Sequence, residues 1–291
     1  MSAQLYIITA KTNLHAGSGS TNAGVIDNLV QRDPSDNLPC TYASSLKGAF
    51  REFFEDGPRK AFTKILADEI FGAGLNKDEP IENETDQQKA ERIKKKKNSK
   101  GTHIFHQASL LSIPVRSNNK PFYNATSPDV LQKFLDEYKL FTDEDYPDKS
   151  AINKLIEKGA AKDKPIVYHA AVEHLRIEDY DISVFEREPS ASVKKLLGDN
   201  IIVMNEEDFK YQCGDLSLPV IARNNLENGE SKNLWYEQIV QREARFWFYT
   251  VHFQSSDNFD NNVNERSVQI GANASIGYGI CKINNYNSQL A

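Results

Sequence analysis

The amino-acid sequence predicts an α+β fold, in which strands and helices follow one another in an irregular order. Apolar, β-prone runs occur near both ends of the chain, at residues 5–8 and 280–283. Between them, several segments repeat their apolar residues at the spacing of an amphipathic helix. Because strands and helices do not alternate regularly, a repeated strand–helix–strand architecture is disfavoured.

The N-terminal part is expected to begin with a strand and to continue into helices. The strand at residues 5–8 leads into a polar loop with glycines at residues 15–20. A helix is expected to begin at Ser44 or Ser45, since serine is a good N-cap. Its buried face is formed by apolar residues at helical spacing, namely Leu46, Phe50, Phe53 and Phe54. A second helix is expected from about residue 59 to residue 71, ending at Gly72.

Residues 76–100 differ in composition from the rest of the chain. The segment is acidic at first, ends in four lysines at residues 94–97, and has almost no apolar residues. Such a segment buries too little apolar surface to offset the entropy of ordering it. We expect a flexible charged insertion, in which the lysines form a solvated loop or, alternatively, contact RNA transiently.

Strands and helices resume at residue 103. Ordered structure is expected at residues 103–115, and Ser127 followed by Pro128 predicts the start of a helix. Its buried face would consist of Val130, Leu131, Phe134, Leu135 and Tyr138. Further along, the patterns predict short helices at residues 152–156 and 192–197, β-rich stretches within residues 166–185, and strands at residues 201–204 and 218–222. Within residues 245–252, aromatic residues fall at both odd and even positions, which predicts a strand that is buried on both faces.

Length and charge limit the classes of function. The chain has 291 residues, a net charge of −6 and a mean hydropathy of −0.58, which excludes a freestanding nucleic-acid binder that relies on bulk positive charge. No apolar run approaches the length of a membrane span, and the N-terminus lacks the features of a signal peptide. The three cysteines, Cys40, Cys213 and Cys281, lack metal-ligand spacing and are expected to be buried thiols. We therefore expect a cytoplasmic protein without a membrane partner.

The start of the first predicted helix is a candidate phosphate site. Residues 44–51 read SSLKGAFR, which places Lys47 and Arg51 on one helical face with Gly48 beside them. Serine hydroxyls, free amides at the helix start and two cations together suit an RNA phosphate. The plainer alternative is an ordinary amphipathic helix whose basic residues are solvated.

Two loops carry further candidates. Residues 271–279 contain Gly271, Gly277 and Gly279, which permit close approach to a ligand or, alternatively, form a tight structural turn. Asp27 follows a glycine-bearing loop, so its carboxylate is a candidate metal ligand or general base. A capping or turn-forming role is the alternative for Asp27.

The order of these motifs strongly resembles the RAMP superfamily of CRISPR RNA-binding proteins. The matching segments are residues 15–19 (HAGSG), 24–33 (GVIDNLVQRD), 44–51 (SSLKGAFR), 269–271 (QIG) and 277–279 (GYG). Residues 108–116 (ASLLSIPVR), 123–128 (YNATSP) and 234–237 (LWYE) resemble the backbone subunit of the type III-B (Cmr) effector complex. The resemblance covers nearly the whole chain except residues 76–100 and 141–165.

The resemblance implies a single RAMP domain over residues 1–291. Its fold would be an RRM-like, ferredoxin-like palm with a helical insertion and a β-hairpin thumb, which we expect at about residues 205–235. Copies would form a filament along a CRISPR guide RNA, together with other type III-B subunits. Each thumb would enter the duplex of guide and single-stranded target RNA at six-nucleotide steps.

The resemblance also implies roles for individual residues in an antiviral endoribonuclease. Asp27 would be catalytic and would bind Mg²⁺ or another divalent ion, with His15, Tyr236 and Glu237 as supporting candidates. The RNA-binding set would be Ser44, Ser45, Lys47, Gly48, Arg51, Gly271, Gly277 and Gly279. A second hypothesis is a non-catalytic guide-RNA-binding scaffold of the same complex, in which Asp27 only shapes its loop. A third is an unrelated α+β binding protein.

Overall fold

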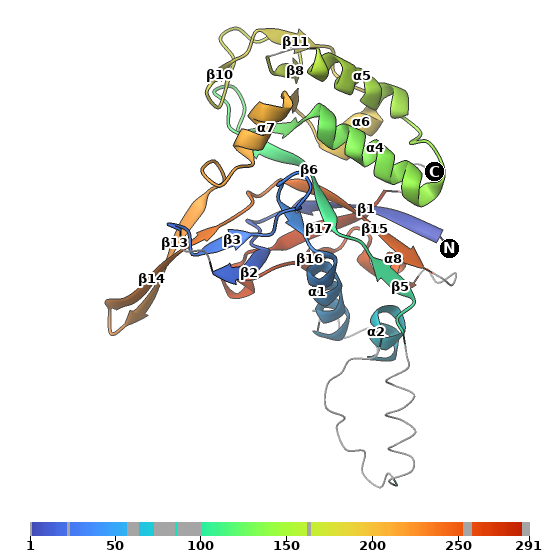
Figure 1. Cartoon of the computed structure of the whole chain (residues 1–291), viewed down its shortest axis with the longest axis vertical. Coiled ribbons are helices and arrows are strands. Elements are labelled where there is room, and N and C mark those ends of the chain that lie inside the picture. The colour runs from blue at the N-terminus through green and yellow to red at the C-terminus, as the bar shows by residue number, and fades with distance from the viewer. Residues whose placement is uncertain are drawn as a thin grey trace.

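The computed structural model describes residues 2–21, 24–56, 64–72, 85, 100–161, 164–252 and 258–286. Within these residues the chain has the predicted α+β fold (Figure 1). The predicted charged insertion, including the lysines at residues 94–97, lies almost entirely outside the described residues. None of the helices in the described part combines the length and apolar character that crossing a bilayer requires.

An eleven-stranded sheet forms the centre of the molecule. Within it, β1 (Ser2–Ala10) lies antiparallel between β15 (Arg245–His252) and β17 (Ile280–Asn285). On one side, β17 pairs with β16 (Ser267–Gln269). On the other, β15 pairs with β6 (Ala108–Val115) and β5 (His103–Phe105), and β6 also pairs with β4 (Cys40–Thr41). All three cysteines are buried, as predicted.

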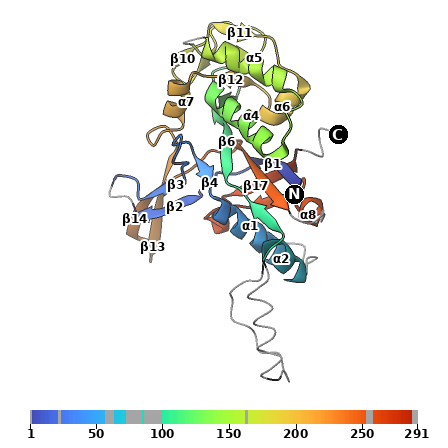
Figure 2. The ribbon, with the colours of Figure 1, turned by 45° about the vertical axis from the view of Figure 1, so that its right-hand side comes forward.

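Helices cover both faces of this sheet (Figures 1 and 2). Strand β15 has aromatic residues on each face. On one face, Phe50 of α1 (Ala43–Asp56) packs against Phe248 with ring centroids 5.6 Å apart. On the other, Phe134 of α4 (Pro128–Thr142) meets Trp247 at 5.6 Å. The prediction that this strand is buried on both faces is therefore confirmed. Helix α2 (Lys64–Phe71) lies next to α1, and α8 (Asn258–Val263) lies at the same face of the sheet. The second helix was expected to begin at about residue 59, but residues 57–63 lie outside the described residues.

The helical insertion extends the sheet at its far end. Its strands are β7 (Tyr123–Thr126), β12 (Ile201–Val203), β8 (Ile166–Tyr168) and β11 (Val184–Glu186), with a separate pair, β9 (Arg176–Ile177) and β10 (Tyr180–Asp181). Its other helices are α5 (Lys149–Ala160), α6 (Ala191–Leu197) and α7 (Glu206–Gln212). Ser127 caps α4 through the Val130 amide, followed by Pro128 as predicted. Helix α5 is longer than the predicted residues 152–156.

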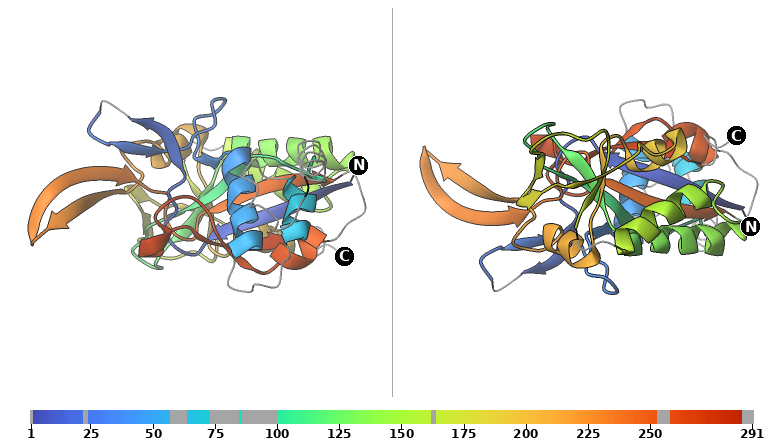
Figure 3. Two further views of the ribbon diagram at one scale, coloured as in Figure 1. Left: turned by 90° about the horizontal axis from the view of Figure 1, so that it is seen from below. Right: turned by 90° about the horizontal axis from the view of Figure 1, so that it is seen from above.

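A long hairpin projects from the body, as Figure 3 shows. It consists of β13 (Val220–Glu227) and β14 (Glu230–Gln238), and we call it the hairpin. At its base, β14 runs parallel to β3 (Asn28–Val30), which pairs with β2 (Gly17–Thr21), so these strands form a separate four-stranded sheet. The predicted thumb range, residues 205–235, overlaps the hairpin but also contains α7.

Candidate functional site

Asp27 lies immediately before β3, at the base of the hairpin. Its amide donates a hydrogen bond to the Tyr236 carbonyl at 3.1 Å, and the Tyr236 amide donates to Asp27 Oδ2 at 2.8 Å. The residue is exposed, and its Oδ1 accepts no hydrogen bond from the described part of the chain. The hairpin strand therefore orients one carboxylate oxygen and leaves the other open to solvent.

Apolar side chains beside Asp27 are open to solvent. Tyr236 is 38% exposed and Leu234, two residues earlier on the same face of β14, is 53% exposed. Val25, two residues before Asp27, is 87% exposed. Exposed aromatic and apolar groups next to a carboxylate are suited to contact unstacked bases.

Glu237 lies on the opposite face of β14 and is only 6% exposed. Its Oε1 accepts from Trp235 Nε1 at 2.8 Å, and its Oε2 accepts from Arg223 Nη1 at 3.0 Å and Asn273 Nδ2 at 2.7 Å. Burial tends to raise the pKa of Glu237, but these three donors outweigh it and lower the pKa. The structure thus presents Glu237 as an anion enclosed by donors; a supporting role in cleavage stays a prediction.

His15 is also enclosed by the chain, with an exposed fraction of 4%. Its Nδ1 lies 2.6 Å from the Gln238 carbonyl oxygen. Because a carbonyl only accepts, Nδ1 carries the proton in this pair. The imidazole therefore faces the end of β14, and the predicted contact of His15 with RNA remains a prediction.

The start of α1 is joined to β3 by Gln31, which lies in the matched segment 24–33 but was not predicted to contact α1. Gln31 follows β3, and its Nε2 donates to Ser45 Oγ at 2.9 Å and to the Gly17 carbonyl at 3.0 Å. Its Oε1 accepts from the Tyr42 amide at 2.7 Å. Ser44, by contrast, is exposed at the surface. Gln31 thus holds the helix start near the strand that follows Asp27.

The two cations of α1 have different surroundings. Arg51 donates to Glu55 and Asp68, at 2.8 Å each, and to the Gly72 carbonyl at 2.7 Å, so it joins α1 to α2. Lys47 has no hydrogen bond or ion pair with any residue that the structure describes. Apart from its chain neighbours and the backbone of α1 itself, no described atom lies within 4 Å of the place where a Cβ on Gly48 would sit. Lys47 and Gly48 are therefore accessible to a ligand, whereas Arg51 would have to exchange protein partners for RNA.

The glycine loop, residues 271–279, packs against the loop that contains His15. Gly271 has φ +80°, and a Cβ there would lie 2.4 Å from the His15 carbonyl oxygen. The Ala272 amide donates to that oxygen at 2.8 Å, and the Gly279 amide donates to the Asn13 carbonyl at 2.8 Å. Gly277 also has a positive φ but open space around it. Gly271 therefore allows a close contact between two backbone segments. The spacing of the glycines alone did not distinguish such a structural role from the binding of a ligand.

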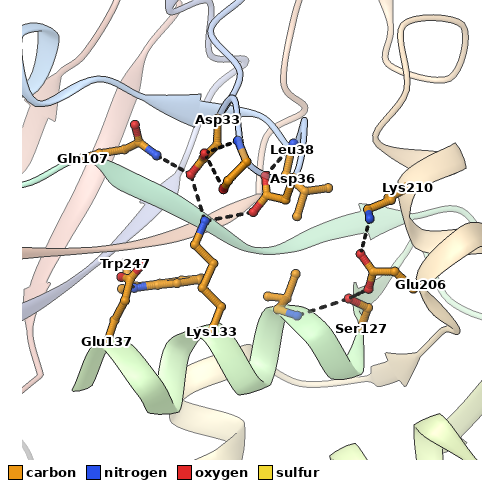
Figure 4. A network of polar contacts seen from close by, with 12 residues as sticks. Asp33, Asp36, Leu38, Gln107, Ser127, Lys133, Glu137, Glu206, Lys210 and Trp247 are labelled. Atoms are coloured by element: carbon orange, nitrogen blue, oxygen red, sulfur yellow. Dashed lines mark hydrogen bonds and ion pairs between the residues drawn. The ribbon is translucent and has the colours of Figure 1, made fainter. Parts of the chain in front are cut away.

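A polar network fixes the loop that leads from β3 to α1 (Figure 4). Lys133 of α4 donates to Asp33 Oδ2 and Asp36 Oδ2, at 2.8 Å each. Asp33 Oδ2 also accepts from Gln107 Nε2 at 2.7 Å. Burial raises the pKa of Asp33, but hydrogen bonds from Lys133 and Ser35 bring it down to about 2. The helical insertion thus holds the segment between Asp27 and Ser44 in place.

The described residues fit a divalent ion only in a limited way. No group of three or more His, Cys, Asp or Glu side chains in the described ranges is arranged to hold a metal. Asp27 supplies one open carboxylate oxygen, and Mg²⁺ commonly binds through one or two carboxylates together with substrate phosphates and water. The site therefore suits an ion held jointly by Asp27 and a bound RNA.

A large groove lies elsewhere. It has a volume of about 970 Å³ and runs between the insertion and the base of β13, where Val115, Phe122, Leu216 and Arg242 contribute to its wall. Asp27 is not among its lining residues. The candidate site is therefore an exposed surface at the hairpin base, of the kind a polymer binds, rather than an enclosed pocket.

Comparisons with known proteins show a family and a related sequence. The model of the RAMP superfamily matches residues 7–282. The CRISPR system Cmr endoribonuclease Cmr4 of Pyrococcus furiosus is 25% identical over 305 residues, covering 97% of this chain and 95% of that protein.

Solved structures have the same fold. A chain of the type III-B Cmr-beta complex in its apo state matches with a TM-score of 0.73 and 23% identity, covering 98% of this chain and 97% of the other. Oligomeric Cmr4 from Pyrococcus furiosus matches with a TM-score of 0.65 and 18% identity, covering 98% of each chain.

Proposed function

Because the chain belongs to the RAMP superfamily, we propose that it is an RNA-guided endoribonuclease and guide-RNA-binding filament subunit of a type III-B CRISPR complex. The observation that carries the proposal is the exposed Asp27 carboxylate, oriented by Tyr236 at the base of a projecting hairpin. Cmr4 of Pyrococcus furiosus, which matches this chain over 95% of its own length, is named an endoribonuclease. One matched structure is described as bound to cognate target RNA. In this role the chain acts in the cytoplasm beside other subunits of the complex.

The guide would follow the start of α1. Ser44 and Gly48 are exposed there, and Lys47 has no ionic partner among the described residues. These groups can approach one phosphate, and successive copies would repeat the contact along the guide. Arg51 would join them by exchanging its contacts with α2.

The hairpin would prepare the target for cleavage. Its exposed Leu234 and Tyr236 would replace stacked bases and free one ribose to rotate. The 2′-hydroxyl of that ribose can then line up with the adjacent phosphorus. This alignment favours the reaction mainly by orienting the reacting atoms.

Asp27 would act on the proton of that hydroxyl. As the 2′-oxygen bonds to phosphorus and the bond from phosphorus to the 5′-oxygen breaks, the open carboxylate oxygen accepts the 2′ proton and water protonates the leaving oxygen. The products are a 2′,3′-cyclic phosphate and a 5′-hydroxyl. Alternatively, the open oxygen of Asp27 would hold a divalent ion instead of accepting the proton, and the ion would supply charge stabilisation for the phosphoryl oxygens.

A non-catalytic scaffold is the second candidate. The hydrogen bonds between Asp27 and Tyr236 would also form if the aspartate only shaped the start of β3. In that case guide binding and filament assembly would survive without any cleavage by this subunit.

The test compares Asp27→Asn with Asp129→Asn in the assembled complex, given guide RNA, Mg²⁺ and end-labelled target RNA. The amide at position 27 still accepts from the Tyr236 amide but no longer acts as a base. Asp129 is an exposed aspartate in the first turn of α4 and is the matched control. We expect products at six-nucleotide spacing for the wild type and Asp129→Asn, and their loss in Asp27→Asn with target binding retained. Binding without products in the wild type would instead support the scaffold.

A further inference from the structure

Besides its pairing with β3, the hairpin is held by two further segments at the point where β14 enters the body. Asn273 of the glycine loop donates to Glu237 Oε2 at 2.7 Å. One residue later, the Gln238 carbonyl accepts from His15 Nδ1 at 2.6 Å. A projecting two-stranded ribbon is flexible unless its base is held, so these contacts limit how far the hairpin can swing.

The segment that carries Asn273 is itself firmly placed. Asn273 has a left-handed backbone, with φ 69°. Next to it, the Ala272 amide is bonded to the His15 carbonyl at 2.8 Å, and Gly271 leaves no room for a side chain there. The glycine loop is thus tied to residues 13–15, which are also next to the end of β14.

Glu237 is suited to hold this contact and unsuited to transfer protons. Both carboxylate oxygens are occupied, by Trp235 on one side and by Arg223 and Asn273 on the other. Arg223 and Trp235 belong to the hairpin, and the Arg223 guanidinium also lies 5.5 Å from the centre of the Trp235 ring. Asn273 is therefore the donor that connects this hairpin cluster to the body.

We propose that Asn273, acting through Glu237, is a positioning residue that sets the angle of the hairpin and so the place where Asp27 meets RNA. The residue before Glu237 is Tyr236, whose amide holds Asp27 Oδ2 at 2.8 Å. A swing of β14 moves that amide and turns the carboxylate with it. The effect on cleavage rests on the proposed function, whereas the effect on the hairpin does not.

The hairpin angle is measured directly, without RNA, by pulsed electron-spin distance measurements on the full chain. Spin labels are placed at Asn228→Cys in the hairpin turn and at Leu140→Cys on α4, which is 72% exposed. The three native cysteines are buried, so labelling favours the introduced ones. We expect Asn273→Gly to broaden the distance distribution about twofold, because glycine keeps the left-handed backbone and removes only the side chain.

The matched control is Asn37→Gly. Asn37 is also left-handed, with φ 61°, and its hydrogen bonds to Asp33 and Arg32 use only the backbone. The control should leave the distance distribution unchanged. Equal distributions for Asn273→Gly and the wild type would overturn the proposal, whether or not the complex cleaves RNA.

Cleavage then shows whether the angle matters for the reaction. In assembled complexes, Asn273→Gly should slow single-turnover cleavage about tenfold and spread the cut positions, with target binding unchanged. The pH profile should keep the wild-type shape, because Glu237 does not exchange a proton in the reaction.

A reversed pair tests the contact itself. Glu237→Gln places an amide opposite the Asn273 amide, and Asn273→Asp places two carboxylates together; each alone should impair cleavage. The double variant allows the amide at 237 to donate to the carboxylate at 273 and should recover part of the rate. A double variant no better than the product of the two single effects would contradict the contact, while loss of all cleavage in the wild type would count against the proposed function alone.

Discussion

At the scale of single residues, the carboxylates near the hairpin differ in how many donors they meet. Asp27 accepts one backbone hydrogen bond and is exposed, whereas Glu237 accepts three and is buried. Asp33 is bonded by Lys133, Gln107 and Ser35. A carboxylate surrounded by donors is held as a stable anion, so Asp27 is the one of these three with an oxygen open to a ligand.

Lys133 should make the stability of the protein depend on pH in acid. The pKa of Asp33 is lowered from 3.8 to about 2, so its contribution is fully present above about pH 4 and is lost as the pH falls through 2. Replacing Lys133 by Met leaves Asp33 and Asp36 without their shared cation. We expect the free energy of unfolding to drop by about 2 kcal/mol at pH 5, as measured by urea unfolding.

The Lys133→Met variant should lose less stability relative to the wild type at low pH, because Asp33 and Asp36 become protonated. The difference from wild type should shrink by about 1 kcal/mol or more between pH 5 and pH 2. Lys139→Met is the control, since Lys139 lies on the same helix, is 66% exposed and should cost less than about 0.5 kcal/mol. An equal difference at both pH values would show that Asp33 does not depend on Lys133.

Residues that act through their neighbours were the hardest to predict from sequence. Asp27 and Ser45 stood out by their residue type within a motif. Gln31 and Asn273 also lie in segments that were singled out, but nothing in those segments showed their contacts, and Lys133 is an ordinary polar residue of a helix. Their partners lie far along the chain: Lys133 meets Asp33, and Asn273 meets Glu237. Such pairings are created by the fold, so spacing within one segment carries no signal for them.

At the scale of elements, spacing within one segment also could not show which partners α1 would meet. The spacing of Lys47 and Arg51 placed them on one face, which suggested that both were free to bind phosphate. The structure packs α2 beside that helix and directs Arg51 to Asp68 and Gly72. The helix itself was predictable from its apolar spacing, but the partner that takes up one of its cations was not.

This difference predicts separate effects for the two cations. Arg51→Ala should lower the free energy of unfolding by about 2 kcal/mol, because three contacts with Glu55, Asp68 and Gly72 are lost. Lys47→Ala should change stability by less than about 0.5 kcal/mol. It should also reduce the salt dependence of guide binding, by lowering the slope of log binding constant against log salt concentration by about 0.7 in magnitude. Thermal unfolding and filter binding of the assembled complex across salt concentrations measure the two effects. Full stability in Arg51→Ala would contradict the role given to its protein contacts.

The hairpin shows why its boundaries were difficult to predict. Most of β13 and β14 is exposed on both faces, so their sequences lack the alternation that marks a half-buried strand. Only residues 218–222 suggested a strand, and these lie where β13 leaves the body. In contrast, β15, which is buried over most of its length, was predicted with the correct burial on both faces.

At the scale of the whole molecule, charge and shape together favour an assembled function. The net charge is −6, yet the α1 surface presents Lys47 beside the open Gly48. One such contact per copy is weak by itself and becomes strong only when many copies bind the same strand. We therefore expect the isolated chain to bind short RNA with a Kd above about 1 μM at physiological salt. Fluorescence anisotropy measures this, and a tighter constant for the monomer would contradict the dependence on assembly.

The most direct test of the central claim uses complexes assembled from wild-type and Asp27→Asn protein mixed in known ratios. If each copy cleaves with its own Asp27, held by its own Tyr236, the product at every six-nucleotide position should fall in proportion to the mutant fraction. The mutant alone should give no product while it binds target as the wild type does. Cleavage that persists undiminished in complexes made only of Asp27→Asn protein would contradict the claim and assign the chemistry to another group.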